Sequence, residues 1–143
     1  MGKNVVSDML HLLANDSRFR HFIEEVTGCG HIGCFMGRVY RMTPDAGHSD
    51  SWHSDIVHGE TRMIGMSLNL SPSEYVGGTL ELRAAADHRI LGLYPNQGLG
   101  DAIVFRLAPS LEHRVAAIQG HAPKTAFAGW FFPEPEFSAL IQA

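Results

Sequence analysis

The stretch "TRMIGMSLNLSPSEYVGGTLELR", residues 61–83, predicts two β-strands joined by a turn-rich loop. In its first half apolar residues alternate with small or polar ones, as in a strand whose successive side chains point to opposite faces. The Ser-Pro pair and the double glycine are turn residues that end the first strand before the second begins. The apolar face consists of Ile64, Met66, Leu68 and Leu70, and the opposite face of Met63, Gly65, Ser67 and Asn69. That second face either lines a ligand pocket or meets solvent.

Short runs of the same kind fill most of the chain after residue 29. The seven candidate strands lie within residues 31–42, 61–70, 77–83, 89–95, 101–107, 112–118 and 124–132. Glycine, proline and asparagine turns separate them, and no pattern of helical length intervenes. A chain of this kind closes as an antiparallel sandwich or barrel, so the sequence predicts a mainly β fold.

Two short amphipathic helices precede the strands. Apolar residues recur at helical spacing first in Val5, Val6, Met9, Leu10 and Leu13, and then in Phe19, Phe22, Ile23 and Val26. Asp16-Ser17 is a helix start signal, and Gly28 is suited to the left-handed residue that ends a helix. We expect one domain over residues 1–143, with a helical buttress (1–28) packed on one sheet, a barrel core (29–132) and a C-terminal tail (133–143).

The composition is that of an ordinary soluble protein. The chain has 143 residues, a formal net charge of −4 and 45% hydrophobic residues, without a run long enough to span a bilayer. It has no basic cluster for nucleic acid and no export signal at its first residues, so we expect a cytoplasmic protein that binds neither nucleic acid nor membrane. Cys29 and Cys34 are expected to be buried thiols.

Histidine is concentrated in "GHSDSWHSDIVHGE", residues 47–60, where His-Ser-Asp occurs twice. On a strand, the first and third residues of such a triplet share a face about 7 Å apart, close enough to converge on one metal ion. The two candidate pairs are His48 with Asp50 and His53 with Asp55. A site with two histidines, one carboxylate and open positions needs one further histidine from another strand.

Three histidines later in the chain are candidates for this further ligand. His88 and His121 lie in turn-like contexts, whereas His113 lies at the start of the apolar strand "EHRVAAI". His113 is therefore the better third ligand. Among other cationic residues, Arg38, Arg83 and Arg106 point either inward to an anionic substrate or outward to solvent. Strand parity does not decide between these, because a register error of one residue reverses every side chain.

The order of the blocks "VYRM", "WHSD", "TRMIGMSLNLSPSEYVGGTLELR", "GDAIVFR", "EHRVAAI" and "KTAFAGWF" resembles the Fe(II)- and 2-oxoglutarate-dependent oxygenases, in particular their prolyl-hydroxylase-like branch. The resemblance covers most of the chain. It implies the double-stranded β-helix, a jelly-roll or cupin-like barrel of two sheets. It also implies Fe(II), 2-oxoglutarate as co-substrate and O2, and it leaves open whether ascorbate serves as an accessory reductant.

In this resemblance "WHSD" takes the place of the first two iron ligands. His53, Asp55 and His113 are then the metal-binding and catalytic residues, and the loop with His48 and Asp50 edges the pocket. His58 is expected at the surface. Relatives that halogenate lack the ligand carboxylate, so its presence here implies hydroxylation.

The co-substrate needs a cation for its C5 carboxylate, and the family usually has an arginine six residues before a tryptophan. Lys124 holds that position before Trp130, and an ammonium neutralises a carboxylate without the two-pronged geometry of arginine. The alternative for Lys124 is a surface lysine. Ala126 stands where relatives often carry a hydroxyl, and Tyr40 is the candidate to replace it. Trp130 and the two phenylalanines after it are expected in the core.

We therefore expect a dioxygenase that hydroxylates an unactivated C–H bond of an amino-acid, peptide or small-metabolite substrate and releases succinate and CO2. A zinc-dependent hydrolase with the same three ligands is one alternative. A ligand-binding or interaction barrel without turnover is the other, because Lys124 and Ala126 depart from the family pattern.

Overall fold

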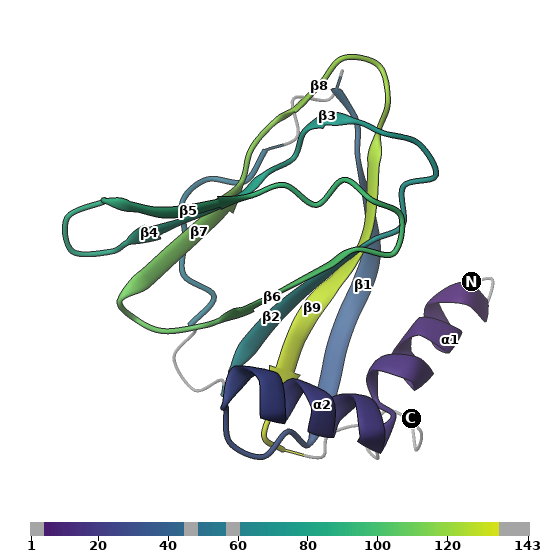
Figure 1. Ribbon diagram of the computed structural model, residues 1–143, viewed down its shortest axis with the longest axis vertical. Coiled ribbons are helices and arrows are strands. Elements are labelled where there is room, and N and C mark those ends of the chain that lie inside the picture. Colours follow the sequence, from purple (N-terminus) through teal and green to yellow (C-terminus); the bar gives the residue numbers. More distant parts are fainter. Residues whose placement is uncertain (1–4, 45–48, 57–60, 135–143) are drawn as a thin grey trace.

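The computed structural model describes residues 5–44, 49–56 and 61–134, which form two helices followed by antiparallel strands (Figure 1). The helices are α1 (Val5–Ala14) and α2 (Ser17–Thr27). The strands are β1 (Cys34–Met42), β2 (Ile64–Asn69), β3 (Val76–Gly77), β4 (Leu80–Ala84), β5 (Ile90–Tyr94), β6 (Ala102–Arg106), β7 (Leu111–Val115), β8 (Ile118–Gln119) and β9 (Lys124–Phe132). The mainly β prediction is confirmed, and each of the seven candidate runs contains a strand. The two-residue pair β3 and β8 was not predicted as a separate sheet, because it is too short to show a period.

The strands form two facing sheets. One has the order β1-β9-β2-β6 and the other the order β5-β4-β7, while β3 and β8 pair with each other. Figure 1 shows the two larger sheets as the sides of a flattened barrel, with β3 and β8 at one end and both helices outside the four-stranded sheet. This is the double-stranded β-helix that the family resemblance implies. Neither helix of the described residues has the length and hydropathy to span a membrane.

The main hydrophobic core lies between the four-stranded sheet and the helices. Its buried residues are Ala14, Ile23, Ile32, Phe35, Ile64, Met66, Phe127 and Phe131. The apolar face of β2 therefore points toward the helices, which buttress the sheet as predicted. The opposite face points into the barrel, where Ser67 lines a cavity and Asn69 is fully buried and donates to the Asn96 carbonyl at 2.9 Å. Of this face, Ser67 lines the pocket and Asn69 is shielded from solvent, whereas Met63, which precedes β2, packs against the core on the helix side.

Local signals place the helices. The Asp16 side chain caps α2 by accepting from the Arg18 N–H at 2.9 Å, and hydrogen bonds from Arg18 lower the pKa of this carboxyl to about 2. Gly28 ends α2 in the left-handed conformation, with a φ of 61°. Both cysteines are free thiols. Cys34 is buried as expected, but Cys29 is only partly so.

Close backbone approach fixes the pairing of β1 with β9. Gly37 and Gly129 face each other in this register, and a Cβ at residue 129 would overlap the Met36 carbonyl oxygen and the Gly37 Cα. Glycine at residue 129 therefore lets the two strands meet where they form one wall of the barrel.

Replacement of Gly129 tests this contact. Gly129→Ala is expected to lower the free energy of unfolding by about 2 kcal/mol or more, because rigid backbone must shift to admit the methyl group. Urea denaturation measures the change. Gly30→Ala is the control, since its Cβ would meet only the Met63 Cε at 3.7 Å; it should change the stability by no more than about 0.5 kcal/mol. Equal stabilities for the two variants would contradict the close approach.

Candidate metal centre

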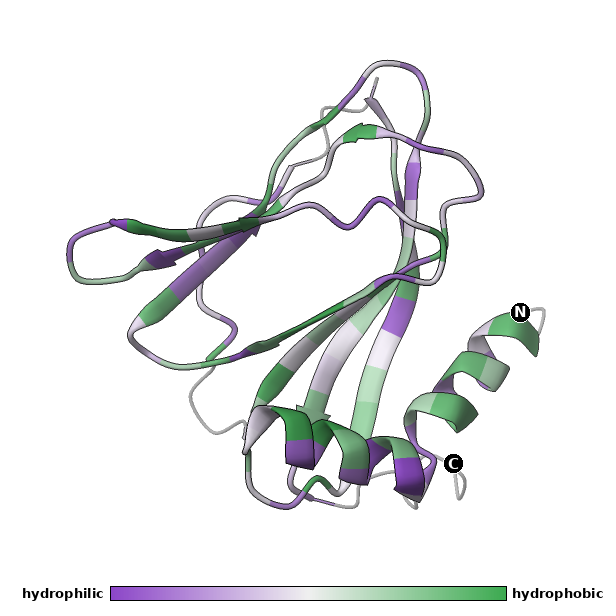
Figure 2. Ribbon diagram, in the orientation of Figure 1, coloured by the Kyte–Doolittle hydropathy of each residue, from purple (hydrophilic) through white to green (hydrophobic). Residues whose placement is uncertain are grey.

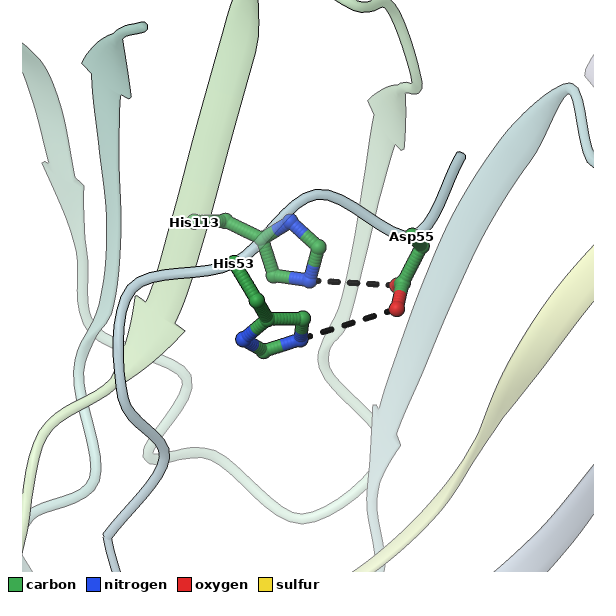
Figure 3. A group of neighbouring side chains, drawn as sticks. All are labelled: His53, Asp55 and His113. Atoms are coloured by element: carbon green, nitrogen blue, oxygen red, sulfur yellow. Dashed lines mark ion pairs between the residues drawn. The ribbon is translucent and has the colours of Figure 1, made fainter. Parts of the chain in front are cut away.

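Three side chains converge inside the barrel, those of His53, Asp55 and His113. One ligating atom from each lies within 4.8 Å of the other two. The Nε2 atom of His53 is 3.5 Å from Asp55 Oδ1, and the Nε2 atom of His113 is 3.2 Å from Asp55 Oδ2 (Figure 3). Figure 3 shows both imidazoles turned toward the same carboxylate. The structure thus brings together the three residues that the sequence selected as ligands.

A backbone bridge sets the two histidines side by side. The His53 N–H donates to the His113 carbonyl at 3.1 Å, and the His113 N–H donates to the His53 carbonyl at 2.9 Å. Residues directly opposite in an antiparallel pair point to the same face, so both imidazoles enter the barrel. The Asp50 N–H extends this contact by donating to the Val115 carbonyl at 3.1 Å. The segment from Asp50 to His53 therefore runs along β7.

Asp55 is held by groups on both sides. The Trp130 indole N–H donates to Asp55 Oδ2 at 2.6 Å, and the Arg62 guanidinium lies 4.0 Å over the Trp130 ring. Burial opposes ionisation of Asp55, but hydrogen bonds from His113 and Trp130 outweigh it and keep the pKa of the carboxyl below its usual value. Asp55 is thus a carboxylate at neutral pH, with its orientation fixed.

Trp130 is the site residue that the sequence prediction missed, because it was assigned to the core with its two phenylalanine neighbours. Phe131 does lie in the core, with no exposed surface. Trp130 and Phe132 instead line the cavity. The signal that would have found Trp130 is its even spacing from Lys124, which places both side chains on one face of β9.

On the outer face of the three-stranded sheet, Trp52 anchors the segment that carries His53. The Arg83 and Arg114 guanidiniums lie 4.3 and 4.7 Å from the Trp52 ring centre, within the range of cation–π contacts. Each arginine is held by a glutamate across the strand pair, Arg83 by Glu112 at 2.6 Å and Arg114 by Glu81 at 2.7 Å. Figure 2 shows that β7, which carries Glu112 and Arg114, is largely hydrophilic. Trp52 therefore packs on two arginines that ion pairs between β4 and β7 hold in place.

These contacts decide the direction of two arginines. Arg83 points outward to Glu112, and Arg106 donates to the Thr27 carbonyl at 2.9 Å, toward the end of α2. Arg38, by contrast, lines the cavity. The inward alternative therefore remains for Arg38.

A cavity of about 1200 Å³ is lined by the three candidate ligands and by a buried cation. Lys124 lies in its wall with 2% of its surface exposed, so the alternative of a surface lysine is wrong. The Lys124 ammonium donates to the Gly78 carbonyl at 2.7 Å and lies 5.8 Å from the Tyr75 ring. Desolvation lowers its pKa to about 8, and the negative charge of Asp50 acts in the opposite direction.

Tyr40 lies in the same wall, paired across the strands with Ala126. Burial raises the pKa of its hydroxyl, an effect that the Ser67 hydroxyl partly offsets. Tyr40 is thus a neutral hydrogen-bonding group beside the lysine. His48 and His58 lie outside the described residues. Asp50, the other member of the alternative pair, acts electrostatically on Tyr40 and Lys124.

The donor set suits a divalent transition ion. Two imidazoles and one carboxylate are ligands that iron and zinc both accept, and three protein ligands leave coordination positions open. The Lys124 ammonium has three N–H donors and, among the described residues, one hydrogen-bond acceptor, the Gly78 carbonyl. A cavity with a metal site and a buried ammonium fits a small organic acid that reaches both.

Comparisons with known proteins agree with this geometry. The family model described as the 2OG-Fe(II) oxygenase superfamily matches residues 37–132. An oxidoreductase of the 2OG-Fe(II) oxygenase family from Burkholderia pseudomallei superposes with a TM-score of 0.67 at 16% identity, over 89% of this chain and 55% of that one. A search of curated protein sequences gave no match.

Two prolyl hydroxylases are also structurally similar. A prolyl-4-hydroxylase from Pseudomonas putida has a TM-score of 0.59 at 22% identity, over 80% of this chain and 61% of that one. A prolyl hydroxylase from Trichoplax adhaerens, in complex with a hypoxia inducible factor oxygen degradation domain peptide fragment, has a TM-score of 0.53 at 19% identity. The match covers 88% of this chain and 63% of that one. At these identities the likeness shows the fold. The chain spans less than two thirds of each of these three structures.

The Trp52 contacts lead to a prediction about metal affinity. Trp52→Ala removes the outer anchor of the His53 segment and is expected to weaken Fe(II) binding about tenfold, as the loss of outer-shell support does elsewhere. Anaerobic calorimetric titration measures the affinity. Trp52→Phe keeps a ring between the two guanidiniums and should retain most of it. If both variants bind Fe(II) as tightly as the wild type while folded, the backbone bridge alone positions His53.

Proposed function

We propose that this chain, which belongs to the 2OG-Fe(II) oxygenase superfamily, hydroxylates an unactivated C–H bond of an amino-acid, peptide or small-metabolite substrate. Family membership implies Fe(II) as the metal and 2-oxoglutarate as the co-substrate. The observation that carries the proposal is the convergence of His53, Asp55 and His113 in one cavity with a buried lysine. The prolyl hydroxylases among the similar structures make a peptide or an amino acid a reasonable substrate class.

His53, Asp55 and His113 would hold the iron. When bound, Fe(II) and 2-oxoglutarate together supply the oxidising chemistry, in which O2 is consumed and the co-substrate becomes succinate and CO2. Asp55 contributes one negative charge, and its hydrogen bond from Trp130 keeps one oxygen in a fixed direction. Because this carboxylate fills the position that a halide would need in a halogenase, the ligand set favours hydroxylation.

Lys124 would bind the C5 carboxylate of 2-oxoglutarate. Its ammonium already donates to Gly78, which fixes the end of a flexible side chain and leaves donors for an anion. The buried position strengthens the ion pair, because little water screens it. Tyr40 is the second candidate for this carboxylate, in place of the hydroxyl that Ala126 lacks. Lysine provides a point charge here rather than the fork of arginine.

The barrel wall also excludes water from this end of the cavity. Tyr75 and Ile118 are buried beside Lys124, with 3% and 5% of their surfaces exposed. The turn at Gly77 and Gly78, both with positive φ, carries the carbonyl that accepts from the ammonium. The closed end thus suits a carboxylate that must stay in place during oxidation of the substrate.

Spectroscopy tests the proposal without a known substrate. Anaerobic addition of 2-oxoglutarate to the Fe(II)-loaded protein is expected to produce the visible charge-transfer band of a chelated keto acid. His53→Ala should abolish the band, and His121→Ala, whose exposed side chain does not line the cavity, should keep it. Succinate should then form when O2 is admitted. Iron binding without a band would favour another co-ligand or hydrolytic chemistry, and no metal binding at all would favour an interaction barrel.

The low pKa of Lys124 predicts a pH dependence of co-substrate binding. The ammonium is charged below its pKa of about 8 and loses its proton as the pH rises through that value. The dissociation constant of 2-oxoglutarate is therefore expected to be flat up to about pH 8 and to rise toward tenfold per pH unit above it. Titrations of the charge-transfer band in buffers of fixed ionic strength, from about pH 6.5 to about pH 9.0, measure this dependence.

Lys124→Arg is the matched variant for this titration, because a guanidinium stays charged over the whole range. It should bind 2-oxoglutarate with little dependence on pH. A wild-type profile that is as flat as the arginine profile would show that the Lys124 charge does not hold the co-substrate.

A further inference from the structure

One wall of the cavity carries a second cation, Arg38. Side chains on alternate positions of β1 face the cavity, and each is paired with a residue of β9. From the closed end outward the pairs are Met42 with Lys124, Tyr40 with Ala126, Arg38 with Ala128, and Met36 with Trp130. Arg38 therefore lies between the lysine and the tryptophan that holds Asp55. Its pairing partner is two residues from Trp130, which is about 7 Å along a strand.

Arg38 has no partner in the described part of the chain, which sets it apart from most arginines. The arginines that hydrogen-bond or pair with a carboxylate or carbonyl are Arg18, Arg20, Arg62, Arg83, Arg89, Arg106 and Arg114. Only Arg38 and Arg41 have no such contact among the described residues, and both line the cavity. Ala128 opposite Arg38 is small, so the space in front of the guanidinium is not filled from that side.

The acidic residues of the cavity wall are committed elsewhere. Asp55 accepts hydrogen bonds from His113 and Trp130. Glu134 accepts from the Thr61 hydroxyl at 2.5 Å, and Asp50 acts on Tyr40 and Lys124 nearer the closed end. The guanidinium of Arg38 is thus a positive charge without a partner among the described residues, in the same cavity as the metal ligands.

We propose that the substrate oxidised in this cavity carries an oxyanion, and that Arg38 binds it. This inference rests on the proposed function, because it assigns Lys124 to the co-substrate and Arg38 to the substrate. A guanidinium presents two parallel N–H donors that match a carboxylate or a phosphate group. The carboxylate of an amino acid, of an acidic side chain or of another small acid has this chemistry, and so does a phosphate ester.

Small fluorinated probes test the inference without the natural substrate. The protein is loaded with Mn(II) and saturated with 2-oxoglutarate, and the paramagnetic relaxation of the ¹⁹F nuclei of trifluoroacetate, fluorophosphate and trifluoroethanol is measured. The anions are expected to relax faster than the neutral alcohol. In Arg38→Gln the enhancement for the anions should fall at least threefold, toward the value for the alcohol. Whichever anion responds more strongly distinguishes a carboxylate from a phosphate.

Arg89→Gln is the control, because Arg89 is an exposed arginine that pairs with Asp87 at 3.7 Å in the turn after β4. It should leave the relaxation of every probe unchanged. Equal anion relaxation in the wild type and Arg38→Gln, or no anion enhancement in the wild type, would overturn the inference. The folded state of Arg38→Gln is checked by its thermal unfolding midpoint.

The charge-transfer band of the Fe(II)-loaded protein separates this inference from the proposed function. Arg38→Gln should form the band with 2-oxoglutarate at wild-type affinity, since Lys124 is unchanged. Loss of the band in that variant would assign Arg38 to the co-substrate and overturn the inference. Absence of the band in the wild type would overturn the proposed function instead, whatever the probes show.

Discussion

The two backbone hydrogen bonds between His53 and His113 are the constraint on which the rest of the site depends. They set the segment before β2 beside β7, and antiparallel pairing then sends both imidazoles to the inner face. Asp55 follows two residues later, where the Trp130 indole holds it. Trp52, which directly precedes His53, points to the outer face, where it packs against two guanidiniums. A single pairing thus places the candidate ligands inside the barrel and Trp52 outside it.

The same alternation of side chains explains where the hydrophobic core lies. The apolar residues of β2, such as Ile64 and Leu68, face outward from the barrel and are covered by α1 and α2. The barrel interior is thereby left to a cavity that polar and apolar side chains line together. In a chain of this length a core inside the barrel would fill the space that a ligand needs. The helices therefore stabilise the sheet from its outer face while the inner face lines the cavity.

The sequence predicted the elements well because their signals are local. Alternation on β2, the Asp16 cap and Gly28 each act within a few residues, and the structure contains all three as predicted. The direction of a side chain depends instead on distant partners. Arg83 faces outward because Glu112 lies on the neighbouring strand, and Trp130 leaves the core because Asp55 arrives from another segment. The even spacing from Lys124 indicates the face of β9 on which Trp130 lies, but no spacing within one strand encodes its contact with Asp55.

Burial distinguishes Lys124 from Arg38, and this difference follows from their places on the strands. Lys124 lies at the closed end, almost without solvent contact, and its lowered pKa reflects the free energy that desolvation costs an ammonium. Arg38 is exposed to the open part of the cavity and keeps its hydration. A carboxylate bound at the poorly hydrated lysine meets a stronger Coulomb attraction and also loses more of its own water than one bound at the exposed arginine. One strand pair thus offers an acid two sites that differ in depth and in hydration.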